Sequence, residues 1–472
     1  MSNMVVVISD LHLEEEQTDL IPTADSAEPI ALRRNVPGSV FESLVANVVR
    51  RARQREVARI DFVLAGDVFD LHRTQLWFTD DCPPEVRPFV DNGQVGSDSP
   101  LERKILAILD AILAETEVKR SVEAFQQLAQ GFYLEGGTLV PIGIPVTLHY
   151  LPGNHDRLAN ATPAIRRRVR EILKLGGDDA LFPHNFMFED PNVFVRHGHE
   201  YDPVNFGSRL KGWRIERDIR PELYDQCTMG DFVTVQVASR LPNLFRRHYR
   251  EQILSDLVLR TVYLRLLEFD DLRPQSIIVG FILDVRPPKE LAAQYNDNRK
   301  AWQALMWHHI EPVMCALLDD VRAALDVHPH IRGLLPWYAR LLLALRPWRW
   351  GVPLWVMQSA AWALKYVDGG GQPERYAARE QALDDGADFV AAGHTHEPQV
   401  AHLFTGHNGR KKYFVDTGTW RNAVLGSFRQ SYFGRVDATT YAAFYGSFGT
   451  ETRSFEYRSS VQQTWPVDDF DR

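Results

Sequence analysis

The chain has 472 residues and a formal net charge of −9, with 45% hydrophobic and 24% charged residues. This composition is typical of a folded protein with a sizeable core, and it excludes a chain that is disordered throughout. The negative charge disfavours a protein whose main task is to grip long nucleic acid through its phosphates, although it does not exclude a local basic groove.

The N-terminal part of the chain alternates strand-like and helix-like segments. We predict strands over 4–9, 61–65 and 146–151, with helices near 39–53 and within 100–130 between them. Strands separated by helical crossovers normally form a mostly parallel sheet. The sequence therefore predicts an α/β fold for this part.

The strand pattern then stops and resumes much later. A helix at 162–175 and a strand at 193–195 are followed, over 206–373, by long amphipathic patterns rich in Leu, Trp and Arg that prolines interrupt. This length is too great for a loop without secondary structure, so we predict a helical insertion. A helix near 374–384 and a strand at 388–392 return to the core pattern. We expect four parts: a first part of the core at 1–205, a helical cap or insertion at 206–373, a second part of the core at 374–460 and a tail at 461–472.

Five short polar clusters follow apolar, strand-like runs in one order along the chain. They are DLH at 10–12, GDVFD at 66–70, GNHD at 153–156, HGH at 197–199 and GHTH at 393–396. In open α/β folds, ligands bind at the carboxyl ends of the strands. We therefore expect the polar side chains of the five clusters to meet at one end of a sheet.

The residue types in these clusters suit divalent metal ions. Asp10 and His12 are two apart where the chain leaves a strand, so they can grip one ion from the same side. Asp67 supplies a carboxylate with two oxygens, which can bridge two cations. Asn154 and His197 add oxygen and nitrogen donors that suit two such ions, of which manganese is the first expectation and iron or zinc the alternatives. The predicted metal ligands are Asp10, His12, Asp67, Asn154, His197, His394 and His396.

The ordered motifs resemble those of the calcineurin-like metallophosphoesterases, whose pattern runs D-x-H, G-D-x-x-D, G-N-H-D/E, H and G-H-x-H. The match covers about 4–205 and 385–457. The resemblance implies a two-sheet β-sandwich flanked by helices, here with a large and mainly helical insertion. It also implies a dinuclear metal centre, whose ligands it assigns as Asp10, His12, Asp67 and His396 for one ion and Asp67, Asn154, His197 and His394 for the other.

The same resemblance implies a hydrolase of phosphoester bonds. Water held between the ions attacks phosphorus, and His155 protonates the leaving group. Asp70 would orient His155, with a turn-stabilising carboxylate as the alternative. His199 would either lie behind the metal ligands or face the substrate. Arg157 would either contact the substrate or form an ion pair.

The motifs leave the substrate open. A phosphodiesterase or phosphatase acting on a small or nucleotide-like phosphoester is the first expectation. The UDP-2,3-diacylglucosamine hydrolase branch shares the sequence SDLHL at 9–13 and the His-Gly pair at 197–198, but it has Arg in place of His155. The alternatives are a pyrophosphatase on a nucleotide-linked or lipid-linked substrate at the membrane surface, a DNA nuclease, and a catalytically silent scaffold that binds membranes or proteins.

The segment 331–367 mixes Trp, Leu and Arg in a way that suits a bilayer interface. Its alternatives are a buried helical pair within the cap and a dimer face, and the sequence leaves the oligomeric state open. Cys82, Cys227 and Cys315 are too few and too scattered to indicate disulfides, and the N-terminus has no secretory pattern. We therefore expect a cytoplasmic protein, with peripheral membrane contact through 331–367.

Overall fold

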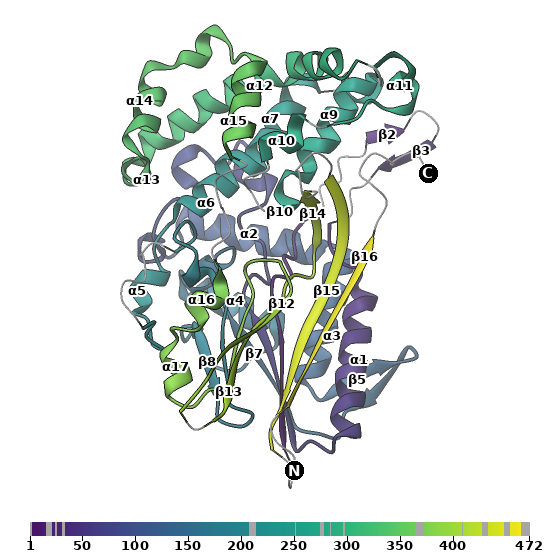
Figure 1. The fold of residues 1–472 in the computed structure, drawn as a ribbon, viewed down its shortest axis with the longest axis vertical. Helices are drawn as coiled ribbons and strands as arrows, with labels where there is room; N and C mark the ends of the chain where they lie inside the picture. The colour runs from purple at the N-terminus through teal and green to yellow at the C-terminus, as the bar shows by residue number, and fades with distance from the viewer. Residues whose placement is uncertain are drawn as a thin grey trace.

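The computed structural model describes a mixed α/β fold with several sheets (Figure 1). The predicted Gly-rich linker at 369–371 and the tail beyond 463 lie outside the described residues. The residues that the structure describes are 2–15, 21–23, 26–30, 34–206, 214–250, 252–273, 278–283, 285–295, 298–364, 372–407, 409–426, 433–447 and 454–463.

The first sheet contains the three strands predicted in the N-terminal part. β1 (Asn3–Ile8), β4 (Arg59–Ala65) and β7 (Val146–Leu151) lie parallel and adjacent, as the crossover pattern predicted. Four further strands complete this sheet in the order β10-β14-β15-β1-β4-β7, with β16 paired to β15. β15 lies antiparallel to β1, β14 and β16, whereas β10 lies parallel to β14. The added strands are β10 (Leu272–Arg273), β14 (Asn422–Gly426), β15 (Phe433–Tyr445) and β16 (Ser454–Gln463).

The second sheet brings the chain before and after the insertion together. Its order is β12-β13-β11-β9-β8, and β11 lies parallel to both β9 and β13. The strands are β8 (Asn185–Phe188), β9 (Val193–Arg196), β11 (Phe389–Ala392), β12 (Gln399–Thr405) and β13 (Lys411–Asp416). One buried apolar cluster draws side chains from both sheets, namely Val5, Val7, Val63, Ala65, Leu151, Val193, Val195, Phe389, Ala391, Val415, Ala442 and Phe444.

Helices cover the other face of the first sheet. Alternate strand residues such as Val6 and Phe62 point into a second apolar cluster with Phe41 and Phe125. These helices are α1 (Gly38–Gln54), α2 (Pro100–Ala114), α3 (Thr116–Ala129) and α4 (Pro163–Leu173). Since both faces of β1 are covered, its sequence from Met4 to Ile8 is continuously apolar.

The region between β9 and β11 is helical in the described residues except for β10. This strand pairs with β14, so the insertion is tied into the first sheet. Its own core surrounds Trp302 and Tyr263. The helices are α5 (Pro221–Tyr224), α6 (Met229–Val233), α7 (Arg240–Tyr249), α8 (Gln252–Ser255), α9 (Leu257–Leu267), α10 (Ile278–Leu283), α11 (Lys289–Tyr295), α12 (Arg299–Val327), α13 (Pro329–Leu334), α14 (Trp337–Leu345) and α15 (Leu354–Leu364).

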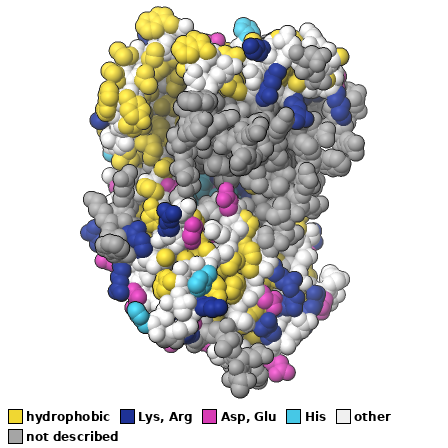
Figure 2. All heavy atoms as spheres, viewed as in Figure 1, with side chains coloured by type: hydrophobic (Ala, Val, Ile, Leu, Met, Phe, Trp, Pro, Cys, Tyr) yellow, Lys and Arg dark blue, Asp and Glu magenta, His cyan; other side chains and the backbone are white. Residues whose placement is uncertain are grey.

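The segment that the sequence left open, 331–367, is described as far as 364. The prediction of a buried helical pair is wrong for α14, because none of its residues is buried. Hydrophobic side chains gather on the surface over α13, α14 and α15, at the upper left of Figure 2. Among the described helices, none combines the length and the apolar composition needed to cross a bilayer.

Three further elements differ from the prediction. The helix expected near 374–384 is two short helices, α16 (Pro373–Ala377) and α17 (Gln381–Asp384), because Glu380 between them forms a β-bridge with Ile215. Residues 461–463 belong to β16 and not to a tail, since they pair with β15. The sequence interpretation also missed the hairpins β2 (Ile21–Thr23)–β3 (Ser26–Ile30) and β5 (Phe132–Glu135)–β6 (Thr138–Pro141).

Candidate metal centre

The five polar clusters lie on loops that leave the two sheets. Three follow β1, β4 and β7 of the first sheet, and two follow β9 and β11 of the second. Backbone hydrogen bonds join these loops beyond the strand ends: the His12 amide donates to the Asp67 carbonyl (2.8 Å), and the Gly393 amide donates to the His197 carbonyl (2.7 Å). The fold therefore brings all five clusters to one end of the paired sheets.

The backbone at this end is unusual. Eleven described non-glycine residues have a positive φ, and five of them are predicted metal ligands: Asp10, His12, Asp67, His394 and His396. Such conformations are costly for residues with a side chain, and they cluster at functional sites. A Cβ at Gly393 would collide with the side chains of Ser9 and Asp10, so the loop before His394 requires glycine.

The first group of candidate ligands consists of Asp10, His12 and His396. The Nε2 atoms of His12 and His396 are 2.9 Å apart, and Nε2 of His396 lies 3.3 Å from Oδ1 of Asp10. The three side chains are buried, and their ligand atoms are close enough to share one ion.

The second group consists of Asp67, His197 and His394, with Asn154 beside them. Nε2 of His197 lies 3.2 Å from Oδ2 of Asp67 and 3.2 Å from Oδ1 of Asn154. Nδ1 of His394 lies 3.0 Å from the same Asn154 oxygen. Oδ2 of Asp67 is also 3.7 Å from Nε2 of His12, so this carboxylate lies between the two groups.

Hydrogen bonds on the far side of each ring indicate which nitrogen carries the proton. Nδ1 of His12 donates to Oδ2 of Asp70 (2.8 Å), and Nδ1 of His197 donates to the Ala65 carbonyl (2.9 Å). Nε2 of His394 donates to Oδ2 of Asp202 (3.2 Å). Because a neutral imidazole carries a single N–H, the other nitrogen of each ring presents a lone pair to the cluster.

This arrangement fits a cation better than it fits a network of hydrogen bonds. With both rings neutral, the lone pairs of His197 and His394 face the Asn154 oxygen, and none of these three atoms can donate a proton. In the metal-free chain, burial lowers the pKa of His197, but the charges of Asp67 and Asp10 outweigh this and raise the pKa to about 10. A cation bound here would therefore displace a proton from His197. Oδ1 of Asp10 is fully buried without a hydrogen-bond partner in the described chain, and such a group is costly unless it is compensated. Carboxylate, amide and imidazole donors together suit a divalent transition metal ion.

His155 and Asp70 lie at the edge of the cluster and contact each other. Nδ1 of His155 is 3.0 Å from Oδ1 of Asp70, whose other oxygen holds His12. The His155 amide donates to Oδ1 of Asp67 (2.8 Å). Burial lowers the pKa of His155 from its ordinary value, while the charge of Asp70 acts in the opposite direction.

Comparison with known protein families, with curated proteins and with solved structures found no match. The support for a function of this chain therefore comes from the geometry of its own residues.

Two of the predicted site residues are engaged by other parts of the chain. For Arg157, the alternative of an ion pair is the one that the structure shows: its Nε donates to Asp231 (2.7 Å), and its terminal nitrogens donate to Asn92 and to backbone carbonyls. His199 is buried behind His197, with ring centroids 5.3 Å apart. Burial lowers the pKa of His199 to about 3, so its ring is neutral.

The structure adds positioning residues that the sequence interpretation did not assign. Asp202 fixes the ring of His394, and Oδ2 of Asp416 accepts a hydrogen bond from Thr395 between the two histidines of the last cluster (2.8 Å). Asp156 accepts hydrogen bonds from the Gly153 amide and from the Tyr150 hydroxyl, and it also accepts from the backbone after β4. Asp156 stands in the cluster at 153–156, whereas the signal for Asp202 was only its acidic character three residues after His199.

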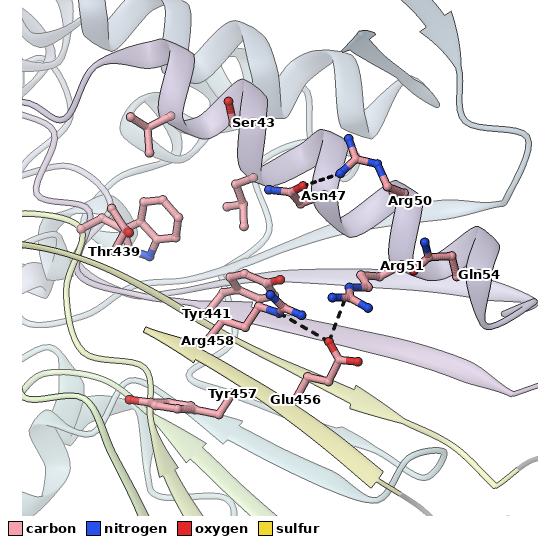
Figure 3. A pocket seen from close by; sticks show the side chains of 13 residues that line it. Ser43, Asn47, Arg50, Arg51, Gln54, Thr439, Tyr441, Glu456, Tyr457 and Arg458 are labelled. Atoms are coloured by element: carbon pink, nitrogen blue, oxygen red, sulfur yellow. Dashed lines mark hydrogen bonds and ion pairs between the residues drawn. The ribbon is translucent and has the colours of Figure 1, made fainter. Parts of the chain in front are cut away.

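A cavity of about 950 Å³ lies elsewhere, between α1 and the strands β15 and β16 (Figure 3). Arg51 and Arg458 enter it, and both approach Glu456, at 3.8 and 3.6 Å. The residues that line it include none of the candidate ligands. The metal centre and this cavity are thus separate features of the fold.

Proposed function

We propose that this chain is a dinuclear-metal-dependent phosphoester hydrolase with the two-sheet sandwich, flanking helices and helical insertion of the calcineurin-like metallophosphoesterases. The observation that carries the proposal is the convergence of seven oxygen and nitrogen ligands in two groups, six of them buried and His394 partly exposed, with Asp67 between the groups. A bridging carboxylate of this kind suits a pair of ions, and manganese is the ion that we expect.

Two divalent ions bound here would acidify water and neutralise the charge on the phosphoryl oxygens. His155 would supply the proton from its imidazolium form: the water oxygen would bond to phosphorus and release its own proton to solvent, the bond to the leaving oxygen would break, and that oxygen would take the proton from Nε2 of His155. Nε2 is the free end of the ring because Nδ1 is held by Asp70. Asp70 is itself fixed by the Arg73 amide, which donates to Oδ1 (2.9 Å).

A small or nucleotide-like phosphoester is the substrate that we propose first, with a phosphodiesterase or phosphatase reaction. A pyrophosphatase acting on a nucleotide-linked or lipid-linked substrate at a membrane surface is the second candidate. The exposed apolar surface over α13–α15 favours it. The three free cysteines support our proposal that the protein works in a reducing cytoplasm.

Hydrolysis of bis-p-nitrophenyl phosphate by the purified chain, with added manganese, tests this function. We expect turnover that EDTA abolishes. Asp67→Asn should lower kcat by more than about 10³-fold, which is more than the removal of one group that stabilises the transition state usually costs. Asp61→Asn is the matched control, because Asp61 lies on β4, the strand that leads to Asp67, but contacts Arg59 and His149. No turnover by the wild type, or equal turnover by wild type and Asp67→Asn, would refute the proposal.

The substrate class requires a wider panel. Nucleotide sugars, cyclic nucleotides, phosphomonoesters and single-stranded DNA separate the candidate substrate classes when they are assayed with the manganese-loaded enzyme. Hydrolysis of one class, followed by chromatography of its products, lost in Asp67→Asn and retained in Asp61→Asn, would assign the substrate.

A further inference from the structure

Nine large apolar side chains lie exposed on α13, α14, α15 and the connections between these helices, and we call this surface the α13–α15 face. Their exposed fractions run from 36% for Val356 to 86% for Trp350. Exposed apolar patches of this kind commonly mark an interaction site. Figure 2 shows these side chains gathered over α13, α14 and α15. The members of the face are Leu334, Trp337, Tyr338, Leu341, Leu342, Leu345, Trp350, Trp355 and Val356.

Buried contacts with α12 hold the helices of this face in place. Trp348, between α14 and α15, is 5% exposed and donates from Nε1 to Oδ1 of Asp319 on α12 (3.1 Å). The indole of Trp307, also on α12, donates to the Val352 carbonyl (2.7 Å). Ile331 of α13 is fully buried in the same cluster as Leu325. The exposed side chains are therefore presented by helices that are anchored to α12.

The charged residues of the face are all positive. Residues 329–364 contain four arginines and no Asp or Glu, whereas the whole chain carries a net charge of −9. Arg332 and Arg346 reach back to Asp326 and Asp319 of α12. Arg340 and Arg349 are exposed beside Leu341 and Trp350. The face thus combines exposed indoles and leucines with cations.

We propose that the α13–α15 face binds the surface of a bilayer that contains anionic phospholipids. Trp and Tyr prefer the boundary between headgroups and acyl chains, where an apolar ring and a polar edge are both accommodated. Leucines on the same side enter the acyl region, and arginines bind the headgroup phosphates. The inference is independent of the proposed hydrolase activity, because none of these residues belongs to the metal centre.

The charge pattern favours this occupant over a second copy of the chain. A two-fold dimer through this face would apply the same patch to itself. Arg340 and Arg349 would then face the arginines of the partner, with no acidic residue in 329–364 to pair with them. An anionic bilayer offers the complementary charge.

Sedimentation of the full-length chain with vesicles tests the proposal. We expect binding to vesicles of phosphatidylcholine mixed with phosphatidylglycerol that weakens at high salt. Arg340→Gln with Arg349→Gln should lower the partition coefficient on these vesicles about 30-fold, since each cation near an anionic surface contributes about fivefold. Trp337→Gln, Trp350→Gln and Trp355→Gln together should lower it about tenfold or more.

The matched control replaces exposed apolar side chains that lie elsewhere. Leu139 and Leu181 are 50% and 60% exposed outside the face, so Leu139→Gln with Leu181→Gln should sediment as the wild type does. All variants should retain the wild-type circular dichroism spectrum. Wild-type protein that does not sediment with these vesicles, or a triple Trp variant that binds as well as the wild type, would overturn the proposal. A dimer in analytical ultracentrifugation that the triple Trp variant loses would assign the face to a second copy, and would overturn it as well.

Discussion

The metal centre and the α13–α15 face depart from ordinary folding in opposite ways. At the metal centre, polar atoms such as Oδ1 of Asp10 are buried without a hydrogen-bond partner in the described chain. On the α13–α15 face, apolar side chains such as Trp350 are exposed to water. Each arrangement is unfavourable in the isolated chain and becomes favourable when a complementary binding partner is present. The difference matches the chemistry of the two partners that we propose: a cation for the first region and a lipid surface for the second.

Among the substitutions that distinguish the metal centre from the α13–α15 face, His155→Gln should have the largest effect. Loss of the proton donor should lower kcat about 10²- to 10⁴-fold on a substrate with an alkyl leaving group. The loss should be smaller with p-nitrophenolate, which leaves without a proton. Steady-state kinetics measures kcat on the two substrates. Metal analysis measures the amount of bound metal, which should stay unchanged.

The pH profile gives an independent readout of His155. A proton donor must hold its proton, so activity should fall as pH rises through the pKa of His155, which burial lowers. This limb should disappear in His155→Gln and remain in His149→Gln, since His149 contacts Asp61 on the neighbouring strand. An identical profile in all three proteins would remove His155 from the mechanism.

Neighbouring tryptophans sharpen the comparison within the cap. Trp348 is 5% exposed and Trp350 is 86% exposed. Trp348→Ala should lower the free energy of unfolding by about 3 kcal/mol, because it leaves a cavity and removes the indole hydrogen bond to Asp319. Trp350→Ala should change that free energy by less than about 0.5 kcal/mol. Urea denaturation measures both changes, and equal losses would mean that Trp350 packs against the chain.

Asp202 tests whether the metal centre extends beyond its ligands. Asp202→Asn should weaken manganese binding about 10- to 100-fold, because the carboxylate fixes the ring of His394 through Nε2. Calorimetric titration of the metal-free protein measures this affinity. Asp218→Asn is the control, since Asp218 is exposed and pairs with Arg217. Unchanged affinity in Asp202→Asn would limit the centre to the seven ligands.

His184 is a partly buried polar group that belongs to neither region, and its titration predicts a pH dependence of stability. Burial lowers its pKa to about 4, and its ring stacks on Tyr224 with centroids 3.7 Å apart. Between pH 6.5 and 4, the unfolded chain binds a proton at His184 that the folded chain does not bind. Stability from this group is therefore complete above pH 6.5, and it is lost as pH falls, by at most about 1.4 kcal/mol per pH unit.

Urea denaturation of the metal-free protein at several pH values checks this effect. The unfolding free energy of His184→Gln should decrease less steeply than that of the wild type across the same window. Parallel curves would show that His184 does not titrate differently in the folded and unfolded chains.

Much of the candidate site was predictable because its signals are local. Each ligand follows an apolar strand within a few residues, and the carboxyl ends of adjacent strands meet. All seven predicted ligands converge for this reason, although they come from loops of two different sheets. The helix at 374–384 was predicted less well, because Glu380 forms a β-bridge with Ile215 and an ion pair with Arg196. Both partners lie far away in the sequence.

The sequence by itself predicted the parallel strands of the first half, the ligand types and a helical segment between the two parts of the core. Only the tertiary structure decided which partner each polar group has. Arg157 is held by Asp231 and His394 by Asp202, and these pairs are 74 and 192 residues apart. The tertiary structure also decided that Trp348 is buried while Trp350 is exposed. The physical reason is that hydrogen-bond partners and burial depend on which distant segments pack together, whereas strand periodicity and ligand chemistry are properties of neighbouring residues.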